Sequence, residues 1–145
     1  MILGMHHSAI AVPDLNKALA FYCDVIGFEI EMEAEVPSGI DVMGTAMGIA
    51  DSGFKIRMLK KGHSHLELFE FVDTEVVNEL RPVNRTGITH VALSTDDIEK
   101  DYKYLADNGV VFNAALFGPI SQRFAYGRDP FGNVIELIEK ENALA

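Results

Sequence analysis

Two segments of this 145-residue chain share the same spacing of a histidine, an aspartate and a lysine. The aspartate follows the histidine by seven residues and the lysine follows it by ten, in the sets His7, Asp14, Lys17 and His90, Asp97, Lys100. Each half later contains a glutamate inside a strand-like apolar run, which is Glu67 in the first half and Glu136 in the second. The sequence therefore indicates an internal duplication that carries a histidine and a glutamate twice.

Alternation along the first predicted strand decides between two adjacent histidines. His6 and His7 are expected on opposite faces of a strand over residues 5–12, and only His7 has the same spacing to the downstream aspartate as His90. Glu67 and Glu136 are each expected on the face opposite their apolar neighbours. If those neighbours pack against helices, both histidines and both glutamates face one concavity.

Two imidazoles and two carboxylates form a mixed nitrogen and oxygen donor set. Such a set suits Zn²⁺, Ni²⁺, Co²⁺, Mn²⁺ or Fe²⁺ with positions left open for water or substrate, whereas Ca²⁺ prefers oxygen ligands alone. We therefore predict one divalent metal ion held by His7, Glu67, His90 and Glu136. His65 is expected either to support this site or to line a pocket beside it, and the spacing of the duplication gives it no counterpart.

The elements that must position these residues follow the order βαβββ twice, which predicts an α+β fold. In the first half, a helix is predicted over 14–25 and strands over 5–12, 28–35, 54–59 and 65–72. In the second half, a helix is predicted over 97–108 and strands over 89–95, 110–113, 123–128 and 134–140. The apolar stripes of the two helices are Leu15, Ala18, Leu19, Tyr22, Ile26 and Ile98, Tyr102, Leu105.

The chain is short enough to be one domain over residues 1–145. Its first module spans about 1–75 and its second about 86–145, and each is too small to be stable alone. The connection between them is predicted at 73–85, where Pro82 lies in a polar stretch. The glycine- and methionine-rich segment 36–53 is either a substrate-covering loop or an irregular extension of the sheet.

Composition narrows the class of partner. A net charge of −10 argues against nucleic acid, which attracts stripes of lysine and arginine. No apolar run approaches the roughly 20 residues that cross a bilayer, and the start lacks the pattern of a signal peptide. With one cysteine, Cys23, an intrachain disulfide is impossible. These features predict a cytoplasmic protein that acts on a small molecule, without a nucleic-acid or membrane partner.

The motifs resemble those of the vicinal oxygen chelate superfamily, which includes glyoxalase I, methylmalonyl-CoA epimerase, extradiol dioxygenases, and bleomycin and fosfomycin resistance proteins. The resemblance covers almost the whole chain and is carried by segments 7–15, 20–22, 26–28, 87–93 and 128–137. It implies two βαβββ modules whose sheets curl into a metal-binding cup. It also implies that the histidine of each first strand and the glutamate of each last strand bind the metal. Relatives often form homodimers, and some build each site from modules of two chains.

The same resemblance implies a lyase or isomerase that transfers a proton next to a carbonyl group. In such enzymes a metal that binds neighbouring substrate oxygens stabilises an enediolate or enolate, and carboxylates at the metal move the proton. Glu67 and Glu136 are the expected catalytic pair. Arg123 and Tyr126, just before the last strand, are candidate substrate contacts beside an ordinary surface or packing role.

Two subfamilies match in part. Glyoxalase I typically carries an arginine shortly after the first histidine, where this chain has residues 10–12 of sequence Ile-Ala-Val, as in methylmalonyl-CoA epimerases. Those epimerases usually carry glutamine at the position of Glu67. Alternative functions are a non-haem Fe(II) dioxygenase that uses His7, His90 and Glu136, and a protein that sequesters a small molecule and binds it without metal.

Overall fold

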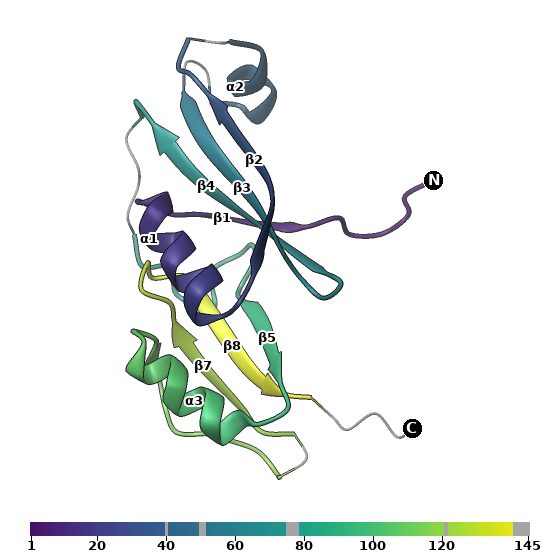
Figure 1. The fold of residues 1–145 in the computed structure, drawn as a ribbon, viewed down its shortest axis with the longest axis vertical. Coiled ribbons are helices and arrows are strands. Elements are labelled where there is room, and N and C mark those ends of the chain that lie inside the picture. The colour runs from purple at the N-terminus through teal and green to yellow at the C-terminus, as the bar shows by residue number, and fades with distance from the viewer. Residues whose placement is uncertain (40, 50–51, 75–78, 121, 141–145) are drawn as a thin grey trace. The chain divides into compact units, whose positions relative to one another are not determined.

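The computed structural model describes residues 1–39, 41–49, 52–74, 79–120 and 122–140 (Figure 1). The chain divides into two units, Met1–Asn78 and Glu79–Ala145, and each contains a four-stranded mixed sheet. The predicted α+β fold of two βαβββ modules is confirmed. Positions 75–78 of the predicted connection lie outside the described residues. Within the described ranges, no helix has the length and apolar character needed to cross a membrane.

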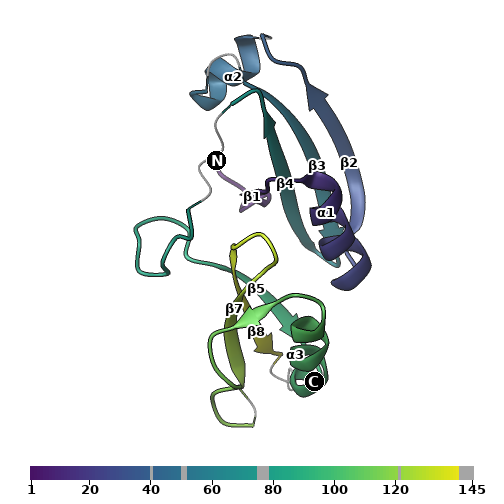
Figure 2. The same ribbon diagram turned by 90° about the vertical axis from the view of Figure 1, so that its left-hand side faces the viewer.

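The first unit is a sheet in the order β1-β4-β3-β2. Strand β1 runs parallel to β4, and the other pairs are antiparallel. Helix α1 continues without a break into the π-helix η1, and α2 lies at the end of the sheet where β2 stops and β3 begins (Figure 2). The elements are β1 (Ser8–Ala11), α1 (Leu15–Leu19), η1 (Ala20–Val25), β2 (Glu29–Val36), α2 (Asp41–Met47), β3 (Gly53–Lys61) and β4 (Ser64–Val72).

The second unit repeats this plan in the order β5-β8-β7-β6. Strand β5 runs parallel to β8, and the remaining pairs are antiparallel. Helix α3 lies alongside β7 and β8 (Figure 1). The elements are β5 (Val91–Thr95), α3 (Ile98–Asp107), β6 (Val111–Phe112), β7 (Phe124–Arg128) and β8 (Val134–Glu139).

The aspartate and lysine of the duplicated spacing start the first helix of each unit. The Asp14 carboxylate accepts the backbone N–H of Lys17 at 3.0 Å, and the Asp97 carboxylate accepts that of Lys100 at 3.2 Å. Both aspartates are N-caps, which satisfy N–H groups that have no partner within the helix. The repeat thus has a structural part, which is the cap, and the histidine remains as the part with no role in helix formation.

Segment 36–53 contains a short helix, α2, which the sequence did not predict. The first helix also differs in its interior. Its C-terminal half is a π-helix, whose wider turn places Phe21 beside Tyr22 among the buried residues, while Leu19 and Ile26 are only half-buried. The predicted stripe contained Tyr22 and left out Phe21.

The apolar neighbours of both glutamates are buried on the helix side of their sheets, as predicted. Leu66 and Leu68 flank Glu67, and Ile135 and Leu137 flank Glu136, and all four leucine and isoleucine side chains are almost inaccessible to solvent. Helix α1 packs on β4 and helix α3 packs on β8. Since side chains alternate along a strand, burying these neighbours turns both glutamates to the opposite face.

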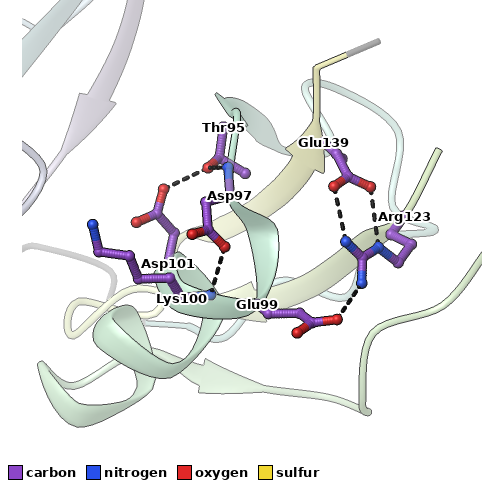
Figure 3. Close-up of polar contacts among 7 residues, drawn as sticks. All are labelled: Thr95, Asp97, Glu99, Lys100, Asp101, Arg123 and Glu139. Carbon is purple, nitrogen blue, oxygen red and sulfur yellow. Dashed lines mark hydrogen bonds and ion pairs between the residues drawn. The ribbon is translucent and has the colours of Figure 1, made fainter. Parts of the chain in front are cut away.

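Arg123 lies on the helix face of the second sheet rather than on the face of Glu136. Its guanidinium donates to both carboxylate oxygens of Glu139 at 2.9 and 3.0 Å and to the Glu99 carboxylate at 2.5 Å (Figure 3). The hydrogen bonds to Glu139 and then to Glu99 raise the pKa of Arg123. These contacts link α3 to β8. They also occupy the guanidinium of Arg123, which was a candidate substrate contact from the sequence.

Glu70 makes the stability of the first unit depend on pH. Its carboxylate accepts a hydrogen bond from Lys55 Nζ at 2.7 Å and from the Leu15 backbone N–H, the start of α1, at 2.6 Å. The Lys55 hydrogen bond and then the Leu15 N–H lower the pKa of Glu70 below its ordinary value of 4.5. A lowered folded pKa means that the stabilisation is complete above the unfolded value and is lost as pH falls through the folded value.

We therefore expect Glu70→Gln to lose stability near neutral pH and to flatten the decline of stability below about pH 4.5. Urea unfolding of wild type and variant, followed by far-UV circular dichroism from about pH 7 to about pH 3, measures both effects. Parallel curves for the two proteins across this range would contradict the role of Glu70.

Candidate metal centre

The first unit brings His7 and Glu67 into direct contact. The Nε2 atom of His7 lies 3.1 Å from an Oε atom of Glu67. Strand β1 pairs in parallel with β4, with Ala9 opposite Glu67, and His7 lies immediately before the first residue of β1. The Glu67 side chain is 11% exposed and that of His7 is 32% exposed.

The second unit builds the same pair from the same register. The Nε2 atom of His90 lies 3.1 Å from an Oε atom of Glu136, and Ala92 stands opposite Glu136 in the parallel pairing of β5 with β8. The side chains of His90 and Glu136 are 28% and 13% exposed. In each half, the predicted histidine ligand therefore lies beside the predicted glutamate ligand. The contacting atoms and the distance between them are the same in the two halves.

The chemistry of each pair fits a divalent cation. A largely buried carboxylate is costly unless a positive group compensates it, and each glutamate has an imidazole nitrogen at its side. Imidazole and carboxylate together are ligands that first-row divalent ions accept. Among the described residues, no three or more histidine, cysteine, aspartate or glutamate side chains gather around one point. The four predicted ligands thus form two pairs, one in each unit.

His6 adjoins the first pair, which the sequence did not indicate. Strand β1 begins at Ser8, later than predicted, so strand alternation does not separate His6 from His7. The Nδ1 atoms of the two rings are 2.8 Å apart. His6 also stacks on His65, with ring centroids 6.1 Å apart, and His65 Nε2 lies 3.1 Å from a carboxylate oxygen of Glu31. His65 is thus linked to the first pair by way of the His6 ring.

Thr89 and Tyr126 adjoin the second pair. Thr89 Oγ1 lies 2.8 Å from His90 Nδ1, and the ring of Tyr126 meets His90 edge-on with centroids 5.0 Å apart. Burial and then a hydrogen bond to Glu136 raise the pKa of the Tyr126 hydroxyl.

Tyr126 also makes the two glutamates different. It stands opposite Glu136 in the pairing of β7 with β8, and Met58 holds the corresponding place opposite Glu67. The duplication is therefore exact for the two histidine–glutamate pairs and not for the side chains that surround them.

A family model described as the Glyoxalase/Bleomycin resistance protein/Dioxygenase superfamily matches residues 4–137, a range that includes both pairs. The chain belongs to this superfamily. It is the superfamily that sequence analysis identified under the name vicinal oxygen chelate, so that the predicted resemblance is confirmed.

The relatives of this superfamily member include proteins named as an epimerase and as a lyase. It is 31% identical over 144 residues to a 2-epi-5-epi-valiolone epimerase of Actinomyces sp., with 94% of this chain and 79% of the relative covered. It is 28% identical to a probable lactoylglutathione lyase of Synechocystis sp., with 92% of each chain covered. The crystal structure of a glyoxalase family protein from Bacillus cereus matches with a TM-score of 0.83 and 28% identity, over 96% of this chain and 95% of that one.

Proposed function

We propose that this superfamily member is a divalent-metal-dependent lyase or isomerase that transfers a proton next to a carbonyl group of a small molecule. The observation that carries the proposal is the pair of matching contacts, His7 with Glu67 and His90 with Glu136, each at 3.1 Å. A duplicated contact between a metal-type imidazole and a largely buried carboxylate has no evident part in folding, because the helices and the apolar faces of the sheets already account for the core.

All four predicted ligands would hold one ion, and the protein would be a homodimer. The two units that form one site would come either from one chain or from two chains. A bound divalent ion would supply Lewis acidity to neighbouring oxygens of the substrate. The Nε2 atoms of His7 and His90 would hold that ion, together with the two glutamates. One glutamate carboxylate takes the proton from the carbon next to the carbonyl, and the other returns it.

The names of the relatives support this reaction type. An epimerisation removes and returns a proton at one carbon, and this chain is 31% identical to an epimerase. The second relative is named as a probable lactoylglutathione lyase. The substrate class we propose is therefore a carbonyl compound with a second oxygen nearby, for which hemithioacetals of 2-oxo aldehydes and acyl-CoA esters are suitable probes.

The metal content of the purified protein tests the proposal first. We expect about one divalent ion per chain in the wild type and its loss in His90→Ala, because that variant lacks one nitrogen ligand. His63→Ala is the matched control, since His63 lies in the turn between β3 and β4 and is exposed. Elemental analysis measures the metal content of the three proteins, after circular dichroism has shown that each is folded.

Other outcomes of this experiment separate the alternatives. Bound iron with Fe²⁺-dependent oxygen consumption would favour a dioxygenase that uses His7, His90 and Glu136. A protein that takes up none of Ni²⁺, Co²⁺, Zn²⁺, Mn²⁺ or Fe²⁺ would overturn the proposal and favour sequestration of a small molecule.

A mixing experiment decides whether one chain or two supply the site. His7→Ala and His90→Ala each remove one ligand, so each variant alone is expected to be inactive. If the site combines units of two chains, a mixed dimer of the two variants contains one intact site, and refolding the variants together restores activity. If one chain supplies all four ligands, refolding them together restores none.

A further inference from the structure

The residue before each candidate metal-binding histidine contacts its other ring nitrogen. His6 Nδ1 lies 2.8 Å from His7 Nδ1, and Thr89 Oγ1 lies 2.8 Å from His90 Nδ1. The two partners differ in type, yet share one property. A neutral imidazole and a hydroxyl can each either donate or accept a hydrogen bond.

This property matters because the opposite nitrogen faces a carboxylate. In each unit the histidine Nε2 lies 3.1 Å from a glutamate oxygen. A carboxylate only accepts hydrogen bonds, so a neutral ring without metal carries its proton on Nε2. Nδ1 then accepts a hydrogen bond, which His6 gives through its own Nδ1–H and Thr89 through its hydroxyl.

Metal ligation through Nε2 would reverse the direction of this hydrogen bond. A histidine that binds a divalent ion through Nε2 must have that nitrogen unprotonated, so the single proton of the neutral ring moves to Nδ1. The Nδ1–H then needs an acceptor, and His6 Nδ1 or Thr89 Oγ1 can accept from it at the same 2.8 Å contact. The number of protons on the ring does not change.

We propose that His6 and Thr89 are positioning residues. His6 pairs with Nδ1 of His7 and Thr89 pairs with Nδ1 of His90, in both tautomers of each ring. Each pairing directs Nε2 of the histidine toward its glutamate and a divalent ion. This inference rests on the proposed function for its metal, whereas the contacts at Nδ1 do not depend on it. Partners at the second nitrogen of a ligating histidine fix its orientation, and their loss typically weakens metal binding by about 10–100-fold.

Each unit holds its positioning residue in a different way. The His6 ring stacks on His65 with an interplanar angle of 23°, and His65 is paired with Glu31. Lys60 Nζ lies 3.3 Å from the other carboxylate oxygen of Glu31, so the group is anchored on β3. Thr89 has a short side chain that needs no such support, and the Tyr126 ring lies at 84° to the His90 ring.

Two variants remove the partner of Nδ1 with little change of shape. Thr89→Val replaces the hydroxyl by a methyl group, and His6→Phe keeps a ring that can stack on His65. We expect each to weaken Zn²⁺ binding by about tenfold or more. Thr89→Ser keeps the hydroxyl and should bind Zn²⁺ within about threefold of wild type, because the donor and acceptor are retained. Thr86→Val and His63→Phe are the matched controls, since both residues are exposed and lie outside the pairs.

The first readout is the tautomer of each histidine, measured by two-bond ¹H–¹⁵N correlation spectra of the histidine-labelled full chain. In the metal-free protein we expect His7 and His90 as the Nε2–H form, and with Zn²⁺ as the Nδ1–H form. In metal-free Thr89→Val, the signal of His90 Nδ1 should shift as it loses its donor, while His7 keeps its signal. The second readout is the Zn²⁺ affinity of all variants by competition with a chelator.

The outcomes separate this inference from the proposed function. Wild-type Zn²⁺ affinity in both Thr89→Val and His6→Phe, or an Nδ1 without a proton in the Zn²⁺ form, would overturn the positioning role. If the wild type takes up none of Zn²⁺, Ni²⁺, Co²⁺, Mn²⁺ or Fe²⁺, the metal proposal fails. The metal-free spectra then still test the contact between Thr89 and His90. A His90 Nδ1 signal that is unchanged in Thr89→Val would rule out this contact.

Discussion

Glu136→Gln is expected to lower the rate of proton transfer by about 10²–10⁴-fold while the protein stays folded. Glutamine has the size of glutamate and can still hydrogen-bond to His90, but it cannot take up a proton at neutral pH. Because Glu136 is 13% exposed and Ile135 and Leu137 are buried on the other face, the strand keeps its place when the charge is removed. Loss of activity therefore reports the carboxylate rather than the fold.

Deuterium exchange from solvent into the C–H next to the carbonyl of the probe substrates measures this step directly. Glu67→Gln should show a loss of the same order, since Glu67 occupies the equivalent position. Glu29→Gln on the exposed edge strand β2 is the matched control and should exchange as the wild type does. Full exchange in Glu136→Gln would rule out the proposed role of this carboxylate.

Leu68→Ala is expected to destabilise the first unit by about 2–5 kcal/mol. Leu68 is fully buried next to Glu67 on β4, on the face that packs against α1. Removing its branched end leaves a cavity, and the lost contacts with the surrounding side chains add to the lost burial of apolar surface. The same packing holds Glu67 on the opposite face, so the variant should also bind Zn²⁺ less tightly.

Urea unfolding followed by far-UV circular dichroism measures the loss of stability. Leu80→Ala is the matched control, since Leu80 has the same side chain at 67% exposure, and it should change the free energy of unfolding by less than about 0.5 kcal/mol. Equal destabilisation in the two variants would show that burial of Leu68 against α1 is not what stabilises this strand.

Several features were predictable because they depend on residues close together in sequence. The spacing of Asp14 and Lys17, repeated at Asp97 and Lys100, specifies a helix cap through one side chain and one backbone N–H. The alternation around Glu67 and Glu136 specifies which side of each strand is apolar. Duplication then made the histidines that precede these caps candidates for the same role.

Other features depend on contacts between strands, which local pattern does not specify. Tyr126 and Met58 occupy equivalent positions opposite the two glutamates only through the register of antiparallel pairing. Arg123 is engaged by Glu99 and Glu139 because α3 packs on β8. Helix α2 had no clear apolar period in a segment rich in glycine and methionine, so neither predicted alternative included it.

The sequence by itself determined the family, the two βαβββ modules and the four side chains expected to hold a metal. Tertiary structure decided that each histidine lies beside the glutamate of its own half, because the parallel pairing of β1 with β4 and of β5 with β8 sets Ala9 and Ala92 opposite the glutamates. It also decided that the His6 ring contacts the His7 ring instead of pointing to the opposite face of the strand, since β1 begins only at Ser8. Where a strand begins and how it pairs depend on hydrogen bonds to residues far along the chain, and no local spacing encodes them.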